Sequence, residues 1–211
     1  MPGKIVVVGS SNTDMIIQSE RIPRPGETVL GGRFAMAAGG KGANQAVAAA
    51  RAGGQVTFVA RVGEDLFGEN AIRGFERDGI DVRHVHKTAG EASGVALIMV
   101  DQRGENSIAV APGANARLTP EDVDGAETAI AESACVLAQL EVPLETAQRA
   151  MELAARHGVR AILNPAPARE LPEALLRVVS VLTPNETEAE LLTGLPARDE
   201  AEDAAAAERL A

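Results

Sequence analysis

The chain of 211 residues has 20 basic and 30 acidic side chains, a formal net charge of −10, and a hydrophobic content of 45%. This content is enough for a sizeable core in one domain or slightly more, whereas the negative charge argues against nucleic acid or an anionic membrane surface as a partner. No apolar run approaches the roughly eighteen residues of a membrane helix, the first residues do not form a signal peptide, and a single cysteine excludes an internal disulfide. We therefore expect a cytoplasmic protein.

Apolar, β-branched runs alternate along the chain with alanine-rich segments of helical pattern. Strands of the buried, parallel type are expected at residues 4–8, 56–62, 135–140, 159–163 and 178–182. Helices are expected at residues 41–52, at 68–78, after the start signal Thr119-Pro120, at 144–157, at 186–192 and from 199 onward. This order predicts an α/β fold with a Rossmann-type parallel sheet, right-handed crossovers and helices on both faces.

Two insertions interrupt this alternation. Short strands are expected at 15–20 and 28–35, on either side of a proline-rich turn, and at 93–100 and 106–111, on either side of a glycine-containing hairpin loop. We predict that these four strands form a small antiparallel β lid over the main sheet. The predicted α/β core therefore comprises residues 1–14, 36–92 and 112–211, and the predicted lid comprises residues 15–35 and 93–111.

Polar residues follow several of the expected strands, where ligands of open parallel sheets bind. Asn12 and Asp14 follow the first strand, and their spacing sends both side chains to one face of an extended backbone. An amide beside a carboxylate suits vicinal hydroxyls, although an ordinary turn explains the same residues equally well. Glu141 follows another strand and either reaches the same crevice or simply precedes the helix that begins after Pro143.

A glycine-rich turn, Gly39-Gly40-Lys41-Gly42, leads into the helix expected at 41–52. Glycines let a ligand approach the backbone, and a helix N-terminus favours polar or anionic groups. Lys41 and Asn44 share one face of the first helical turn. The segment matches neither the Walker P-loop nor the Gly-x-Gly-x-x-Gly fingerprint, and a purely structural glycine turn is the alternative.

Asn185 and Glu188 follow the last expected strand and share a face of the opening turn of the next helix. They could hold phosphate or a hydrated Mg²⁺, or they could form an ordinary helix cap. We interpret His84 and His86, which alternate on a possible strand, as exposed residues, and Cys135 as an inert core thiol.

Four segments of the chain resemble the PfkB-type carbohydrate kinase family and, within it, the ribokinase branch. They are Val8-Gly9-Ser10 with Asn12 and Asp14, the run from Gly39 to Ala46, the run from Asn164 to Pro172, and the run from Thr183 to Glu190. The spacing of Gly39, Gly40, Asn44, Gly53 and Gly63 also matches the signature of this family. The resemblance spans essentially the whole chain and implies a ribokinase-like fold with a lid that covers the sugar.

This resemblance implies ATP-dependent phosphorylation of D-ribose at its 5-hydroxyl to give ribose 5-phosphate, with Mg²⁺ and a monovalent cation (K⁺) as cofactors. The implied sugar-binding residues are Asn12, Asp14, Gly40, Lys41, Gly42, Asn44 and Glu141. Asn185 is implied in nucleotide binding, and Glu188 in a water-mediated contact with Mg²⁺. The implied partners are a small-molecule sugar and a second copy of the chain, which binds through the lid.

One departure from the family pattern is large. Members of the family continue into strands that complete the ATP site, with a Gly-Ala-Gly-Asp motif whose Asp is the general base, and with the monovalent-cation site. No Gly-Asp dipeptide occurs in the 211 residues. We therefore expect the N-terminal portion of such a kinase, with no catalytic residue of its own and no turnover alone. The alternatives are a non-catalytic sugar-binding or partner-binding protein, and a kinase of another sugar such as deoxyribose or fructose.

Overall fold

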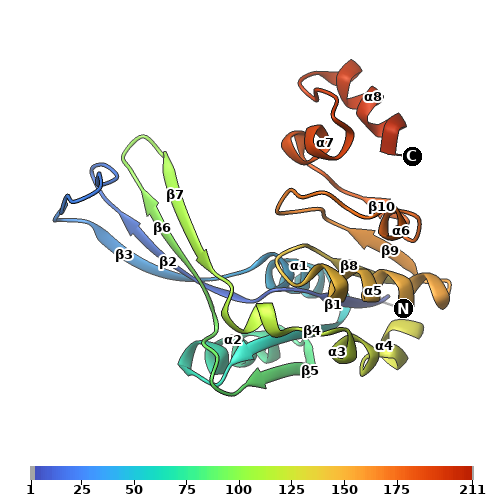
Figure 1. Ribbon diagram of the computed structural model, residues 1–211. Helices are drawn as coiled ribbons and strands as arrows, with labels where there is room; N and C mark the ends of the chain where they lie inside the picture. The colour runs from blue at the N-terminus through green and yellow to red at the C-terminus, as the bar shows by residue number, and fades with distance from the viewer. Residues whose placement is uncertain (1–2, 211) are drawn as a thin grey trace.

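A parallel β-sheet forms the centre of the computed structural model, which describes residues 3–210 (Figure 1). Its strands lie in the order β10-β9-β8-β1-β4-β5, and all neighbouring pairs are parallel. The predicted parallel α/β sheet is therefore confirmed. The strands are β1 (Lys4–Val8), β4 (Gln55–Gly63), β5 (Asp81–Thr88), β8 (Cys135–Ala138), β9 (Arg160–Leu163) and β10 (Val181–Leu182).

Helices cover both faces of this sheet because apolar side chains alternate along the central strands. Val7 of β1 packs with Phe58 and Phe75 against α1 and α2, and the two rings meet edge to face at a centroid distance of 5.1 Å. Val6 and Val8 belong to the cluster on the opposite face. The helices are α1 (Lys41–Arg51), α2 (Leu66–Arg77), α3 (Pro120–Asp124), α4 (Glu127–Ala131), α5 (Leu144–Arg156), α6 (Glu173–Leu176), α7 (Glu186–Thr193) and α8 (Glu200–Leu210), with a 3-10 turn η1 (Gly113–Arg117).

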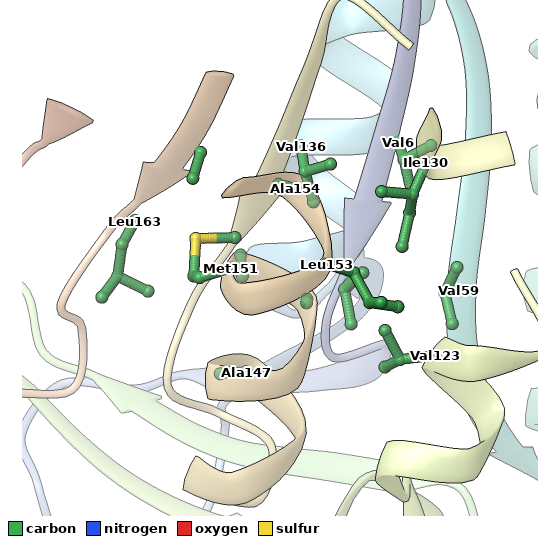
Figure 2. Packing of buried hydrophobic residues seen from close by; sticks show 14 of the residues in the cluster. Val6, Val59, Val123, Ile130, Val136, Ala147, Met151, Leu153, Ala154 and Leu163 are labelled. Atoms are coloured by element: carbon green, nitrogen blue, oxygen red, sulfur yellow. The ribbon is translucent and has the colours of Figure 1, made fainter. Parts of the chain in front are cut away.

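Helix α5 packs across the sheet on this opposite face (Figure 2). Ala147, Met151, Leu153 and Ala154 are fully buried there, in a cluster that includes Val136 of β8. Small alanines let the helix approach the strands closely, at the packing density of a protein interior. This contact also holds the loop between β8 and α5, which carries Glu141, at the carboxyl end of the sheet.

A second, smaller sheet extends away from the main one (Figure 1). Strands β2 and β6 follow β1 and β5 in the chain, so both leave the main sheet in the same direction and pair in parallel. Strands β3 and β7 then return antiparallel. The small sheet is confirmed, but it is mixed and not purely antiparallel. Its order is β3-β2-β6-β7, with bounds Asn12–Gln18 (β2), Arg33–Gly39 (β3), Gly94–Val100 (β6) and Asn106–Ala111 (β7).

Two strands of the small sheet differ in extent from the predicted segments 15–20 and 28–35. Strand β2 begins at Asn12, and β3 ends at Gly39, directly before α1. Alanine and glycine are weak strand formers, so residues 35–39 become a strand only through their pairing with β2. The division of the chain into core and lid at the predicted boundaries stays a prediction.

The last helices form a separate contact beyond β10 (Figure 1). Helices α7 and α8 pack on each other through Ala189, Ala197 and Ala206. Both helices were predicted. Within residues 3–210, no helix is both long and apolar enough to cross a membrane.

Candidate functional site

The turn that leads into α1 packs directly against the loop that leaves β1. Gly40 caps α1 with a φ of 89°, in the left-handed region that favours glycine. A Cβ atom on Gly42 would lie 2.5 Å from the backbone nitrogen of Ser10, and one on Gly39 would overlap the carboxylate of Asp14. Backbone conformation at Gly40 and close backbone contact at Gly42 thus require glycine, whereas a side chain at position 39 would displace the carboxylate of Asp14. The same contact brings together two segments that are remote in sequence.

Glu141 joins these two segments from the loop after β8. Its Oε2 accepts hydrogen bonds from the Ser10 hydroxyl at 2.5 Å and from the Lys41 backbone N–H at 2.8 Å. A carboxylate at this end of a helix also interacts favourably with the helix dipole. The next amides of α1, those of Gly42 and Ala43, donate to Ser10. The chain therefore uses the start of α1 to organise its own site.

Asp14 lies close enough to Glu141 for their charges to interact. Burial raises the pKa of Asp14 above its usual range, and the negative charge of Glu141 raises it further. An ionised carboxylate only accepts hydrogen bonds, and two of them in one place repel an anionic ligand. The arrangement therefore suits a neutral ligand with several hydroxyl groups.

Asn12, at the start of β2, is buried and is held by a residue that the sequence analysis did not single out. Its Oδ1 accepts a hydrogen bond of 2.7 Å from Nδ2 of Asn115, in η1. The two asparagines are 103 positions apart in the chain. A single asparagine in a short turn carries no sequence signal that would indicate this contact. Only the folded chain reveals this contact. Asn12 and Asp14 lie two positions apart in β2, so their side chains leave the strand on the same face.

Lys41 and Asn44 lie in the first turn of α1, as predicted. Asn44 is exposed and lines a cavity of about 500 Å³ between α1, α2 and the small sheet, together with Asn12. Asp14, Lys41 and Glu141 do not line this cavity. We place the candidate site at the carboxylates, because hydrogen-bonding groups from three segments converge there, and the cavity adjoins it.

Asn185 and Glu188 form a capping box at the start of α7. The Asn185 side chain accepts from the backbone N–H of Glu188 at 2.8 Å, and the Glu188 carboxylate accepts from the backbone N–H of Asn185 at 2.9 Å. This is the alternative that the sequence left open. It occupies one oxygen of each side chain, and Glu188 is only 6% exposed.

Two histidines and the cysteine lie apart from these groups. His84 and His86 are half-buried on β5, so the prediction that they are exposed was wrong. They lie on a strand that packs against η1 and the α2 side of the sheet, and burial lowers the pKa of His84. Cys135 is half-buried at the start of β8. Among residues 3–210, no cluster of three or more His, Cys, Asp or Glu side chains could hold a metal ion.

Known families provide an independent comparison. Residues 2–210 match the pfkB family carbohydrate kinases, which is nearly the whole chain. The chain belongs to this family. A ribokinase of Haemophilus influenzae is 45% identical over 196 residues, and a deoxyribokinase of Salmonella typhi is 44% identical over 193 residues. The chain spans 64% and 63% of the length of these two pfkB relatives.

The fold of a solved family member agrees closely with the present structure. The structure of Arabidopsis thaliana ribokinase complexed with ribose and ATP superposes with a TM-score of 0.88 at 32% identity. The superposition covers 100% of this chain and 69% of the plant protein. The resemblance to the ribokinase branch and the ribokinase-like fold, both predicted from sequence motifs, are therefore confirmed.

Proposed function

We propose that the chain provides the sugar-binding part of a kinase that transfers the γ-phosphoryl group of ATP to the 5-hydroxyl of D-ribose, giving ribose 5-phosphate. The observation that carries this proposal is the convergence of Asn12, Asp14 and Glu141 on the glycine turn before α1. A neutral sugar requires donors and acceptors without a basic pocket, and this group of side chains has that character.

Each of these residues has a distinct part in the proposed site. Asp14 accepts hydrogen bonds from sugar hydroxyls, and Asn12 binds beside it on the same face of β2. Glu141 holds the start of α1 in place, with Gly40 and Gly42 allowing the sugar to approach the backbone. Lys41 and Asn44 complete the site from the first turn of α1. Phosphoryl transfer depends mainly on such positioning and on charge neutralisation.

ATP, Mg²⁺ and K⁺ are the proposed cofactors. Asn185 would face the nucleotide phosphates, and Glu188 would contact Mg²⁺ through water. The capping box is compatible with this role, because each of the two side chains has a second polar atom that the cap does not use. Mg²⁺ bound to a nucleotide usually takes only one or two protein carboxylates. Such an ion would neutralise phosphate charge during transfer.

The proposed partner is a second copy of the chain, bound through the small sheet. Ile17, Phe34, Met36 and Leu97 are 42%, 61%, 49% and 55% exposed. Strand alternation and register place all four on the same face of this sheet. Contiguous exposed apolar side chains commonly mark an interface. A cytoplasmic location, and the absence of nucleic-acid or membrane partners, stay predictions.

We further propose that the 211 residues bind sugar without turning over. The chain spans about two thirds of the length of the Haemophilus influenzae ribokinase. None of the site residues proposed above acts as the general base that accepts the proton of the sugar hydroxyl. Isothermal titration calorimetry with ribose, deoxyribose and fructose tests binding and sugar preference together. Deoxyribose is the second candidate substrate, because a deoxyribokinase is almost as similar as a ribokinase. An assay for ADP release tests turnover.

We expect ribose to bind most tightly and Asp14→Asn to weaken binding at least about tenfold, since hydrogen bonds to a charged group contribute about 1.5–3 kcal/mol. Asp203→Asn, an equal change of charge at an exposed position of α8, is the matched control and should leave the affinity unchanged. Absence of binding by the unmodified chain would contradict the proposed function.

A further inference from the structure

Asn115 is one of the most buried polar residues of the described chain, at 1% exposure. Its Oδ1 accepts from the backbone N–H of Ser11 at 2.9 Å. Its Nδ2 donates to the Ser11 carbonyl at 3.1 Å and to Oδ1 of Asn12 at 2.7 Å. A single side chain from η1 thus holds the loop after β1 and the first residue of β2 through three hydrogen bonds.

These contacts determine the orientation of both amide groups. A backbone N–H can only donate and a carbonyl can only accept, so the two bonds to Ser11 leave Asn115 a single orientation. Nδ2 of Asn115 therefore faces Asn12, and Asn12 must present its oxygen to it. The amino group of Asn12 is consequently the end of the amide left for other partners. Asn12 acts as a donor beside Asp14, which acts as an acceptor.

The backbone around this pair excludes other arrangements. Gly94, the register partner of Asn12 on β6, has no room for a side chain, because a Cβ atom there would overlap Oδ1 of Asn12 and Nδ2 of Asn115. Strands β2 and β6 both begin at this point. The amide pair therefore lies where the small sheet leaves the main one.

We propose that Asn115 is a positioning residue that fixes Asn12 as a hydrogen-bond donor to the ligand. The donor at Asn12 and the acceptor at Asp14 then select a ligand with two hydroxyls of matching arrangement, one accepting and one donating. This inference rests on the proposed function, since it concerns the same sugar site. It adds a specificity-determining role to a residue that does not itself contact the sugar.

Asn115→Asp tests the proposal with almost no change of shape. The new carboxylate still accepts from Ser11 N–H but donates neither to the Ser11 carbonyl nor to Asn12. The amide of Asn12 therefore reverses and presents its oxygen to the ligand. We expect ribose affinity, measured by calorimetry on the 211-residue chain, to fall about tenfold, in the range of one lost hydrogen bond. Asn106→Asp, at an exposed position of β7 that does not line the cavity, is the control and should bind ribose normally.

A double-mutant cycle separates positioning from a general structural role. In an Asn12→Ala background, Asn115→Asp should cause a much smaller loss of affinity, because only the lost bond to the Ser11 carbonyl remains once the Asn12 amide is absent. An equal loss in both backgrounds, or unchanged affinity of the single variant, would overturn the proposal. If Asn115→Asp fails to fold, Gly94→Ala replaces it in both backgrounds, since it disturbs the same amide pair without adding charge.

NMR of the unmodified chain provides a readout that does not depend on any variant. The side-chain NH₂ of Asn115 should exchange slowly with solvent, and ribose should shift the NH₂ resonances of Asn12. Ribose binding without a shift at Asn12 would refute the donor role while leaving the proposed function intact. Absence of ribose binding would instead contradict the proposed function, and rapid exchange at Asn115 would still reject the amide geometry.

Discussion

Glu141 connects three segments of the site, and replacing it with glutamine tests this connection. Its Oε2 accepts from the Ser10 hydroxyl and from the first amide of α1. Glutamine keeps the size of the side chain and an oxygen that can accept both bonds, but it removes the charge. The substitution therefore isolates the electrostatic part of the contact from its shape.

The expected loss follows from the two hydrogen bonds. Bonds to a charged group contribute about 1.5–3 kcal/mol and neutral ones about 0.5–1.5 kcal/mol, so each bond loses about 1 kcal/mol. Removing the charge also relieves the repulsion between the two carboxylates, since the negative charge of Glu141 raises the pKa of Asp14. This relief offsets part of the loss of stability. We therefore expect a net loss of about 1–2 kcal/mol, which lowers Tm by about 2–8 °C for a chain of this length.

Thermal unfolding followed by circular dichroism measures this change, and Glu145→Gln is the matched control. Glu145 is an exposed acid in the first turn of α5, so its loss should remove only the dipole contribution of about 0.3–1 kcal/mol. Glu141→Gln should also bring the pKa of Asp14, measured by NMR, closer to its usual range. A Tm equal to or above that of the unmodified chain, with an unchanged pKa at Asp14, would refute the reasoning.

Two further substitutions and one thiol reaction test the packing. Gly42→Ala should destabilise the chain by about 1–3 kcal/mol in urea unfolding, because the new Cβ would lie 2.5 Å from the Ser10 nitrogen. Gly74→Ala should instead stabilise the chain by about 0.5–1 kcal/mol. Gly74 lies in the interior of a helix, and the nearest atom to its new Cβ would be 3.8 Å away. Equal effects of the two changes would contradict the close contact at Gly42. Burial raises the pKa of the Cys135 thiol, so its reaction with a disulfide reagent should reach half-maximal rate at a higher pH than that of free cysteine. A lower midpoint would contradict the burial.

Local patterns in the sequence predicted most elements of this fold. Alternating β-branched runs and alanine-rich segments indicated the strands and helices of the parallel sheet, because hydrophobic periodicity reflects burial directly. The predicted helix start at Thr119 and Pro120 is confirmed, and Thr119 forms a capping box with Asp122. The position of polar residues after strands indicated Asn12, Asp14 and Glu141, since the carboxyl ends of parallel strands lie at the same edge.

The tertiary structure alone decided the features that depend on remote contacts. Strands β2 and β6 are parallel because they continue β1 and β5 in one direction, which no local pattern of hydrophobicity encodes. Residues 35–39 form a strand by pairing with β2, against the weak strand propensity of alanine and glycine. The polarity of the Asn12 amide depends on Asn115, 103 positions away. Sequence patterns thus identify which groups are available, whereas long-range packing determines which end of each group the ligand meets.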